Sequence, residues 1–234
     1  MKEENRVKEK QLAASKALQF IKSGMVVGLG TGSTVKFMLE GLAKMVRSGL
    51  EIKTVSTSIA TTQFAESLGI RVSELKDVND IDLTIDGTDE VDPQLNGIKG
   101  GGGALLYEKI IASLSGKNIW IVDSSKFVKK LGKFPLPVEV LPFGSKKLFN
   151  KLNSLGYNPR IRMENDKPFV TDGNHYIIDL GIDQTDDIRK LNTELKSFPG
   201  VIETGFFIDI CNVLIVGKES ECEMIFKNEK DRFI

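Results

Sequence analysis

Short apolar runs that alternate with longer amphipathic stretches place the strongest constraint on what this chain can fold into. The run at 25–30, for example, directly precedes a stretch with helical periodicity at 31–46. Such alternation with short loops predicts a parallel sheet that is covered by helices. Ligands of these sheets bind beyond the carboxyl ends of the strands. The expected strands are 25–30, 51–58, 70–75, 81–86 and 118–126, and the expected helices are 9–22, 31–46, 60–69 and 104–114.

The pattern changes at 129–143, where three prolines and a glycine interrupt the alternation. The order that follows is βαββαβ, which predicts a ferredoxin-like α+β domain. The run at 213–218 has the character of another core strand, and we expect it to rejoin the first sheet. The chain would then have a Rossmann-like catalytic domain (1–131 plus 208–234) with a smaller ferredoxin-like domain (132–207) inserted near the C-terminus. The expected elements of the second domain are strand 138–142, helix 146–156, strand 160–164, a hairpin at 169–180 that turns at Asp172-Gly173, helix 185–198 capped by Thr185 or Asp186, and strand 201–207.

Composition limits the class of protein. The 234 residues are sufficient for one large or two small domains, and the 32 basic residues balance the 32 acidic ones. No basic stripe indicates a nucleic acid partner, and no apolar run approaches the roughly 18–20 residues that span a membrane. The charged N-terminal stretch does not resemble a secretory signal. Cys211 and Cys222 have neither metal-ligand nor CxxC spacing, so we expect free thiols and a cytoplasmic location.

The glycine-rich and hydroxyl-rich junction at 28–34 is the first candidate binding site. Backbone N–H groups at the start of a helix, together with the positive end of its dipole, favour an anion such as a phosphate. The alternative is a tight turn in which Ser33 or Thr34 caps the helix. The junction lacks the lysine of a Walker A loop, and Ser33 replaces the third glycine of a dinucleotide loop. A nucleotide is therefore disfavoured.

The second candidate is the stretch 83–108, which combines carboxylates, a lysine and four consecutive glycines. Its first strand ends on Asp86, and Lys99 directly precedes the glycines. Each glycine costs roughly 1 kcal/mol to order relative to alanine, so a run of four indicates that the backbone must approach a ligand closely. These features suggest a small anionic substrate and a proton transfer. The acids of the stretch are Asp86, Asp89, Glu90, Asp92 and Glu108.

The acids could form a metal cluster, but neither the calcium-loop spacing nor the Asp-x-Asp of aspartyl phosphatases is present. A solvated acidic loop is the other reading, and spacing alone does not decide against it. Glu108 is more informative, because its helical neighbours three and four positions away are apolar. A carboxylate at the edge of a buried stripe can serve as a general base. Lys109 has nearly as apolar a set of neighbours, so periodicity alone does not decide between the two. We expect His175 to be a structural or surface residue. Thr31, Ser58, Asp86 and Lys126 all follow strand ends and should meet at one edge of the sheet.

Four motifs in order resemble type A ribose-5-phosphate isomerases: GLGTGST, TIDGTDEVD, IKGGGGALLYEKI and VDSSK followed by LGKFPLPVEVLP. The resemblance extends through essentially the whole chain. It implies an enzyme without cofactor or metal that interconverts ribose 5-phosphate and ribulose 5-phosphate in the pentose phosphate pathway. The departure from the family pattern is Gly103, where alanine is usual; it loosens the start of the helix but removes no chemical group.

The resemblance also implies the roles of individual residues. Glu108 would be the general base, and Asp86, Asp89 and Lys99 would act on the sugar oxygens. We expect a homodimer, although no residue pattern gives the oligomeric state. The implied substrate-binding residues are Thr31, Gly32, Ser33, Thr34, Asp86, Gly87, Thr88, Asp89, Lys99, Gly100, Gly101, Gly102 and Lys126.

Two other functions fit parts of the pattern. A phosphosugar sensor would need the same sheet and phosphate loop but no base on the helix that follows the glycines. A CoA-dependent acyl transferase would use Glu108 as a nucleophile, and binding of CoA would reveal it. Isomerisation through an enediolate instead needs one base that reaches two adjacent carbons and a group that stabilises the developing negative charge.

Overall fold

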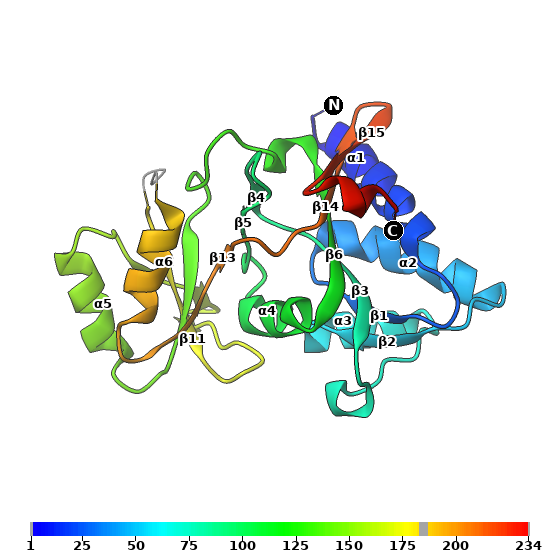
Figure 1. The fold of residues 1–234 in the computed structure, drawn as a ribbon. Coiled ribbons are helices and arrows are strands. Elements are labelled where there is room, and N and C mark those ends of the chain that lie inside the picture. Colours follow the sequence, from blue (N-terminus) through cyan, green and yellow to red (C-terminus); the bar gives the residue numbers. More distant parts are fainter. Residues whose placement is uncertain (1, 183–186, 234) are drawn as a thin grey trace. The chain divides into compact units, whose positions relative to one another are not determined.

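The structure is a computed structural model that describes residues 2–182 and 187–233 (Figure 1). The chain forms two compact units. Unit 1 comprises 1–88, 107–127 and 209–234, and unit 2 comprises 89–106 and 128–208. These limits lie close to the domain boundaries expected near 131 and 208. The segment 89–106, expected in the first domain, belongs to unit 2 because its backbone pairs with 205–207.

Unit 1 is built on a six-stranded sheet in the order β15-β14-β6-β3-β1-β2. All neighbours pair in parallel except β15, which runs antiparallel to β14. The pairing of β14 with β6 confirms that 213–218 rejoins the first sheet and that the second domain is an insertion. The strands are β1 (Val26–Leu29), β2 (Lys53–Ser56), β3 (Ile81–Asp86), β6 (Ser115–Asp123), β14 (Val213–Lys218) and β15 (Glu221–Phe226).

Helices cover this sheet as the sequence predicts for a Rossmann-like domain. Figure 1 shows α1 and α2 lying together against the sheet, where their apolar faces join one core with the strands. None of the helices within the described residues is long and apolar enough to cross a membrane. The helices are α1 (Lys2–Ala17), α2 (Ser33–Arg47), α3 (Ile59–Ser67) and α4 (Leu105–Ser113), and the 3₁₀ helices of unit 1 are η1 (Leu18–Phe20), η2 (Leu75–Asp77), η3 (Ser124–Lys126) and η4 (Glu229–Phe233).

Gly28 allows α4 to pack closely on the sheet. A Cβ atom at this position would lie 3.0 Å from Cγ2 of Ile111 and would also collide with the hydroxyl of Thr84. Ile111 belongs to α4 and is buried against Val55 and Ile81 of the sheet. The first glycine of the 28–34 junction is therefore required by packing, whereas the later ones lie beyond the end of β1.

Unit 2 contains an antiparallel sheet in the order β12-β7-β11-β8 with two helices. When these four strands are numbered by their order in the chain, they lie side by side in the sheet as 4-1-3-2. This order confirms the ferredoxin-like arrangement. A three-stranded sheet, β13-β5-β4, and a short hairpin of β9 and β10 complete the unit. The elements are β4 (Glu90–Val91), β5 (Gly97–Ile98), β7 (Leu136–Val140), α5 (Ser145–Ser154), β8 (Arg160–Ile161), β9 (Met163–Glu164), β10 (Lys167–Pro168), β11 (Tyr176–Leu180), α6 (Ile188–Lys196), β12 (Val201–Thr204) and β13 (Phe206–Phe207).

Several expected elements differ from the structure. The strand expected at 70–75 is wrong: the segment is irregular up to η2, with Ser73 N donating to Thr54 O at 2.8 Å. The expected strand 160–164 is divided into β8 and β9, which pair with different partners. Helix α6 begins behind the side chain of Asp187, which accepts a hydrogen bond from Lys190 N. The expected caps Thr185 and Asp186 lie outside the described residues.

Asp231 contributes stability to unit 1 that depends on pH. Its buried carboxylate accepts hydrogen bonds from Lys117 Nζ at 2.5 Å and from Asn228 N at 3.1 Å. Burial alone would raise the pKa of Asp231, but these hydrogen bonds outweigh it and hold the pKa below its ordinary value. The resulting stability is present above the unfolded-state pKa of about 3.9 and is lost as the pH falls through the folded-state pKa.

We therefore expect Asp231→Asn to lower the melting temperature at pH 7, because the amide keeps the shape but loses the charge. The difference from the parent should shrink as the pH falls below about 4. Thermal unfolding followed by circular dichroism at several pH values measures it. A difference in melting temperature that is the same at pH 7 and at pH 3 would contradict this account.

Candidate active site

In unit 1, the junction at 28–34 presents a helix start with no side-chain cap. Helix α2 begins at Ser33 behind Gly32, which has a φ of 123° and makes no capping contact. The alternative of a Ser33 or Thr34 cap is therefore not what the structure contains. The first backbone N–H groups of a helix have no acceptor within the helix. Together with the helix dipole they favour an anion, as the sequence predicts.

Hydrogen bonds draw the strand ends of unit 1 together. Thr31 N donates to Asp86 Oδ1 at 2.9 Å, and the Thr31 hydroxyl lies 2.8 Å from that of Ser58. The convergence of these three residues at one edge of the sheet is confirmed. Gly30 is required here, because a Cβ atom on it would lie 2.5 Å from Cα of Asp86. The side chain of Thr31 belongs to a group of four hydroxyls contributed by Thr31, Thr57, Ser58 and Thr61.

Asp86 is buried at the end of β3, with only 3% of its surface exposed. Its Oδ1 also accepts from Gly87 N at 2.7 Å, so two backbone amides fix this carboxylate. Hydrogen bonds from amides favour the charged form of a carboxylate and orient it. Asp86 is therefore a hydrogen-bond acceptor of fixed orientation, and it lies at the same edge of the sheet as the junction at 28–34.

Lys10 is a residue of this edge that the sequence reasoning missed. It belongs to α1, and its Nζ donates to Ser33 Oγ at 3.0 Å. A cation beside the start of α2 adds to the attraction for an anion. Nothing in the sequence pairs Lys10 with Ser33, since 23 positions separate them. A hollow of about 60 Å³ borders the same loop, between the starts of α2 and α3.

Lys126 lies on η3, which follows β6 in the same sheet. Two carboxylates tie down this short helix. Glu9 Oε2 accepts from both the amide and the hydroxyl of Ser124, at 2.9 and 2.8 Å. Asp123 caps η3 by accepting from Ser125 N at 3.1 Å. The backbone of the helix that carries Lys126 is thus held by two carboxylates.

Glu108 occupies the fourth position of α4 in unit 1 and is buried, with 4% of its surface exposed. The neighbouring Lys109 is half-buried. The expectation that Glu108 belongs to the buried side of the helix is thus confirmed. A carboxylate in such a position can act as a general base on a bound substrate.

In unit 2, Asp89 and the glycine loop 100–103 are held against each other. Gly101 N donates to Asp89 Oδ2 at 2.7 Å. A Cβ atom on Gly101 would lie 2.6 Å from Asp89 Oδ1, so this contact requires glycine. Gly101 and Gly102 are exposed, and their backbone is accessible to a ligand. The close backbone approach predicted from the glycine run is therefore available.

Gly103 departs from the family pattern, and the structure gives a reason for glycine here. Its φ is 81°, which side-chain-bearing residues rarely adopt. A Cβ atom would also collide with the ring of Phe169. Gly103 N donates to Gly100 O at 3.0 Å and closes the loop. The aromatic ring of Phe169 therefore occupies the space that an alanine methyl group would need.

Lys99 is buried in unit 2, with 2% of its surface exposed. Its Nζ lies 5.3 Å from the centre of the Phe207 ring, and its backbone N donates to Gly205 O. A buried cation next to the glycine loop can stabilise negative charge on a substrate oxygen. The strand β5 and its pairing with β13 position it.

The two remaining acids of the stretch have structural partners in unit 2. Glu90 accepts from Gly132 N and Phe134 N at 2.7 and 2.8 Å. Asp92 Oδ1 accepts from Gln94 N and Asn96 N, both at 2.9 Å. Across the described ranges, no cluster of three or more His, Cys, Asp or Glu could hold a metal ion. Glu90 and Asp92 thus organise loops, while Asp86 and Asp89 remain the candidates for chemistry.

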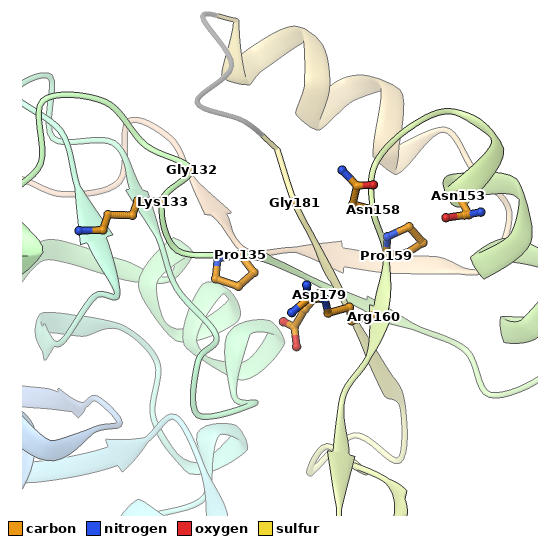
Figure 2. A pocket seen from close by; sticks show the side chains of 9 residues that line it. All are labelled: Gly132, Lys133, Pro135, Asn153, Asn158, Pro159, Arg160, Asp179 and Gly181. Atoms are coloured by element: carbon orange, nitrogen blue, oxygen red, sulfur yellow. The ribbon is translucent and has the colours of Figure 1, made fainter.

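Unit 2 contains features outside these candidates. His175 Nδ1 lies 3.0 Å from Glu139 Oε1, which also accepts from Thr171 Oγ1, and this fits a structural histidine. A pocket of about 720 Å³ lies on the same unit. Asp179 and Arg160, which are paired across β11 and β8, lie side by side at its wall (Figure 2). None of the residues predicted for the site lines it, so this pocket is separate from them.

A parallel sheet whose strand ends carry an uncapped helix start and a fixed carboxylate is typical of enzymes that act on small phosphorylated metabolites. The sequence profile of the family described as ribose 5-phosphate isomerase A (phosphoriboisomerase A) matches residues 53–221. The chain is 52% identical over 210 residues to ribose-5-phosphate isomerase A of Limosilactobacillus reuteri, covering 89% of this chain and 92% of the relative. The chain belongs to the ribose 5-phosphate isomerase A family.

Solved structures agree with this family. A D-ribose-5-phosphate isomerase in complex with phospho-erythronic acid is 39% identical and matches with a TM-score of 0.89, covering 93% of this chain and 97% of that one. Ribose 5-phosphate isomerase A from Methanocaldococcus jannaschii is 35% identical with a TM-score of 0.88, covering 93% and 98%. The fold predicted from the sequence is therefore confirmed.

Proposed function

We infer that this chain is an aldose–ketose isomerase that interconverts D-ribose 5-phosphate and D-ribulose 5-phosphate in the non-oxidative pentose phosphate pathway. The observation that carries this conclusion is membership of the isomerase family together with a buried glutamate on the helix that follows the glycine run. A phosphosugar sensor would not need such a base. A related structure holds phospho-erythronic acid, whose carboxylate resembles the planar, negatively charged enediolate of this reaction.

In this mechanism Glu108 removes the proton from C2 of the open-chain aldose, and the electrons of that bond form an enediolate. The same carboxylic acid then returns the proton to C1, which gives the ketose. Oxidation at C2 balances reduction at C1, so the reaction needs no external oxidant or reductant. Glu108 is suited to this role because it is buried and lies near the start of α4.

Negative charge develops on the oxygens of C1 and C2 during this transfer. We propose that Lys99 stabilises it with a buried cation, and that the amides of the glycine loop donate hydrogen bonds to it. Asp86 and Asp89 would move the hydroxyl protons and assist opening of the sugar ring. Each of these carboxylates accepts at least one backbone amide, which holds it in place for such a role.

The phosphate group would bind at residues 31–34, where α2 starts without a cap. Lys10 and Lys126 would add positive charge, and Gly87 and Thr88 would contribute to the same edge. Binding energy from this remote group can orient the reacting carbons without taking part in the chemistry. Most of the substrate specificity would then come from the phosphate.

A coupled assay that detects ribulose 5-phosphate tests this function. Purified chain should convert ribose 5-phosphate, and the reverse reaction should start from ribulose 5-phosphate. A parallel incubation with CoA tests the acyl transferase alternative. Binding of ribose 5-phosphate without any turnover would favour the sensor and contradict our conclusion.

Activity should survive removal of divalent metal ions, because Lys99 and backbone amides can supply the electrophile. Exhaustive chelation followed by the coupled assay measures this, and we expect the rate to stay within about twofold of the untreated enzyme. The coupling enzyme must be tested separately with chelator. Loss of activity that a divalent ion restores would refute the prediction.

We also propose a cytoplasmic homodimer. Neither Cys211, which is buried, nor Cys222, which is half-buried, forms a disulfide within the described residues, and this suits a reducing compartment. Burial is the main cause that raises the pKa of the Cys222 thiol, so it is less reactive than an exposed cysteine. Light scattering after size-exclusion chromatography would measure the oligomeric state.

A further inference from the structure

Arg162 connects the sheet of unit 2 to the glycine loop. Its Nε and Nη2 bind the two carboxylate oxygens of Asp179 at 3.0 and 2.5 Å. Its Nη1 donates to the carbonyl oxygens of Gly100 and Gly101 at 2.7 and 3.2 Å. Both charged side chains are largely buried, with 16% and 19% of their surface exposed. One guanidinium therefore holds two consecutive peptide groups of the loop.

The surroundings fix the orientation of this arginine. Asp179 belongs to β11, in the middle of the sheet, and its bidentate pair with Arg162 sets the plane of the guanidinium. Phe169 also packs against this arginine, with its ring centre 5.9 Å from Arg162 Cζ. The same ring lies against Gly103, where it occupies the place of a Cβ atom. Arg162, Asp179 and Phe169 together form what we call the loop clamp.

The clamp determines which way the loop amides point. All described peptide bonds are trans, and in a trans peptide the carbonyl and the amide N–H point in opposite directions. With the Gly100 carbonyl turned to Arg162, the Gly101 amide faces Asp89, as its 2.7 Å hydrogen bond records. With the Gly101 carbonyl turned the same way, the exposed Gly102 amide also faces away from the guanidinium.

We propose that Arg162 is a positioning residue for isomerisation, which sets the Gly102 amide to bind the enediolate oxygen and orients Asp89 through Gly101. The proposal rests on the proposed function. A cation bound to a carbonyl also polarises the peptide, so the amide on its far side becomes a stronger donor. Arg162 thus acts at one remove, without touching substrate.

Glycine makes this control necessary. Four consecutive glycines have wide conformational freedom, so the peptide planes of the loop would rotate without an external constraint. Preorganised donors are effective because they need no reorganisation when charge develops. The clamp supplies that constraint from a β-sheet, which is more rigid than a loop.

The test compares Arg162→Gln, Arg162→Lys and Asp179→Asn with the parent. We expect Arg162→Gln to lower kcat for ribose 5-phosphate by about tenfold to a hundredfold, while KM stays within about threefold. Arg162→Lys keeps a cation but loses the bidentate geometry, so it should be intermediate. Asp179→Asn should lower kcat less than Arg162→Gln does. In the variant that combines Arg162→Gln with Asp179→Asn, the loss of kcat should be smaller than the product of the two single losses.

A second readout separates positioning from a loss of folding. Affinity for phospho-erythronic acid should fall in parallel with kcat, because its carboxylate uses the same donors as the enediolate. Melting temperatures must show that each variant is folded at the assay temperature. Arg71→Gln, which changes an exposed arginine of unit 1, is the control and should behave as the parent.

The outcomes distinguish the inference from the function on which it rests. A parent that does not isomerise ribose 5-phosphate would overturn both. An active parent with an Arg162→Gln variant that keeps kcat within about threefold would overturn the clamp alone. If Arg162→Gln does not fold, Arg162→Lys and Asp179→Asn decide, and full kcat in both would overturn it. If kcat falls only in proportion to the fraction of folded enzyme, the loop clamp is overturned as well.

Discussion

Replacing Glu108 by Gln is expected to lower kcat for ribose 5-phosphate by at least about a hundredfold. The amide keeps the shape and hydrogen-bonding reach of the side chain but removes the basic lone pair, and a positioned general base contributes about 10²–10⁴-fold. Substrate affinity should change little, because the proton is transferred after binding. Steady-state kinetics with the coupled assay, combined with direct measurement of substrate binding, provides both values.

Lys109→Gln is the matched control, one position along the same helix, and it should keep most of the activity. A Glu108→Gln enzyme with kcat within about tenfold of the parent, a barrier change below ~1.4 kcal/mol, would exclude Glu108 as the base. Suspicion would then pass to Asp86 or Asp89, which Asp→Asn variants test in the same way. Burial of Glu108 makes a folding control necessary, so thermal unfolding should accompany the kinetics.

The second large effect concerns recognition of the phosphate. The Ser33→Ala and Lys126→Ala double variant should raise KM for ribose 5-phosphate by about tenfold or more, since charge-assisted contacts with a doubly charged anion are strong in a partly buried site. Lys10→Ala should act in the same direction, because Lys10 donates to Ser33. The effect on kcat should be smaller than the effect on KM.

Ribose without the phosphate provides the complementary measurement. The parent should handle it poorly, and the double variant should narrow the difference in kcat/KM between ribose 5-phosphate and ribose. Lys129→Ala, an exposed lysine near Lys126 in sequence, is the control. Equal turnover of ribose and ribose 5-phosphate by the parent would contradict binding of the phosphate at residues 31–34.

The sequence predicted the parts of the fold that rest on strong local patterns. The strand at 81–86 matches β3 to the residue, and the ferredoxin-like order follows from the succession of elements alone. The stretch 70–75 misled because Ile70 and Val72 alternate with polar residues as in a strand. In the structure it is irregular, and it bonds to Thr54 of β2 through Ser73 N and Arg71 O. Local pattern does not reveal whether a partner strand is available.

β15 was missed for the opposite reason. Its charged residues, Glu221 and Glu223, conceal a period-two pattern in which Cys222, Met224 and Phe226 pack on the core of unit 1. Counting alternate positions would have found this edge strand.

The candidate site shows a similar division. Motifs that are contiguous in sequence, such as the glycine run and its neighbours, could be identified directly. Contacts between distant segments could not be identified from the sequence. They include the hydrogen bond from Lys10 to Ser33 and the one from Arg162 to the carbonyl oxygen of Gly100. No local periodicity encodes a side-chain hydrogen bond across 62 positions, because such a bond depends on how whole elements pack.

The larger segment of unit 2, 128–208, is inserted between β6 and β14, and this has a consequence for the order in which the protein is made. On the ribosome, every residue of unit 2 has been added before β14 emerges, because unit 2 ends at 208 and β14 begins at Val213. Until then β6, a central strand of the unit 1 sheet, lacks one of its two neighbours. We therefore expect the ferredoxin-like unit to fold first during synthesis, while the edge of β6 stays open to mispairing with other chains.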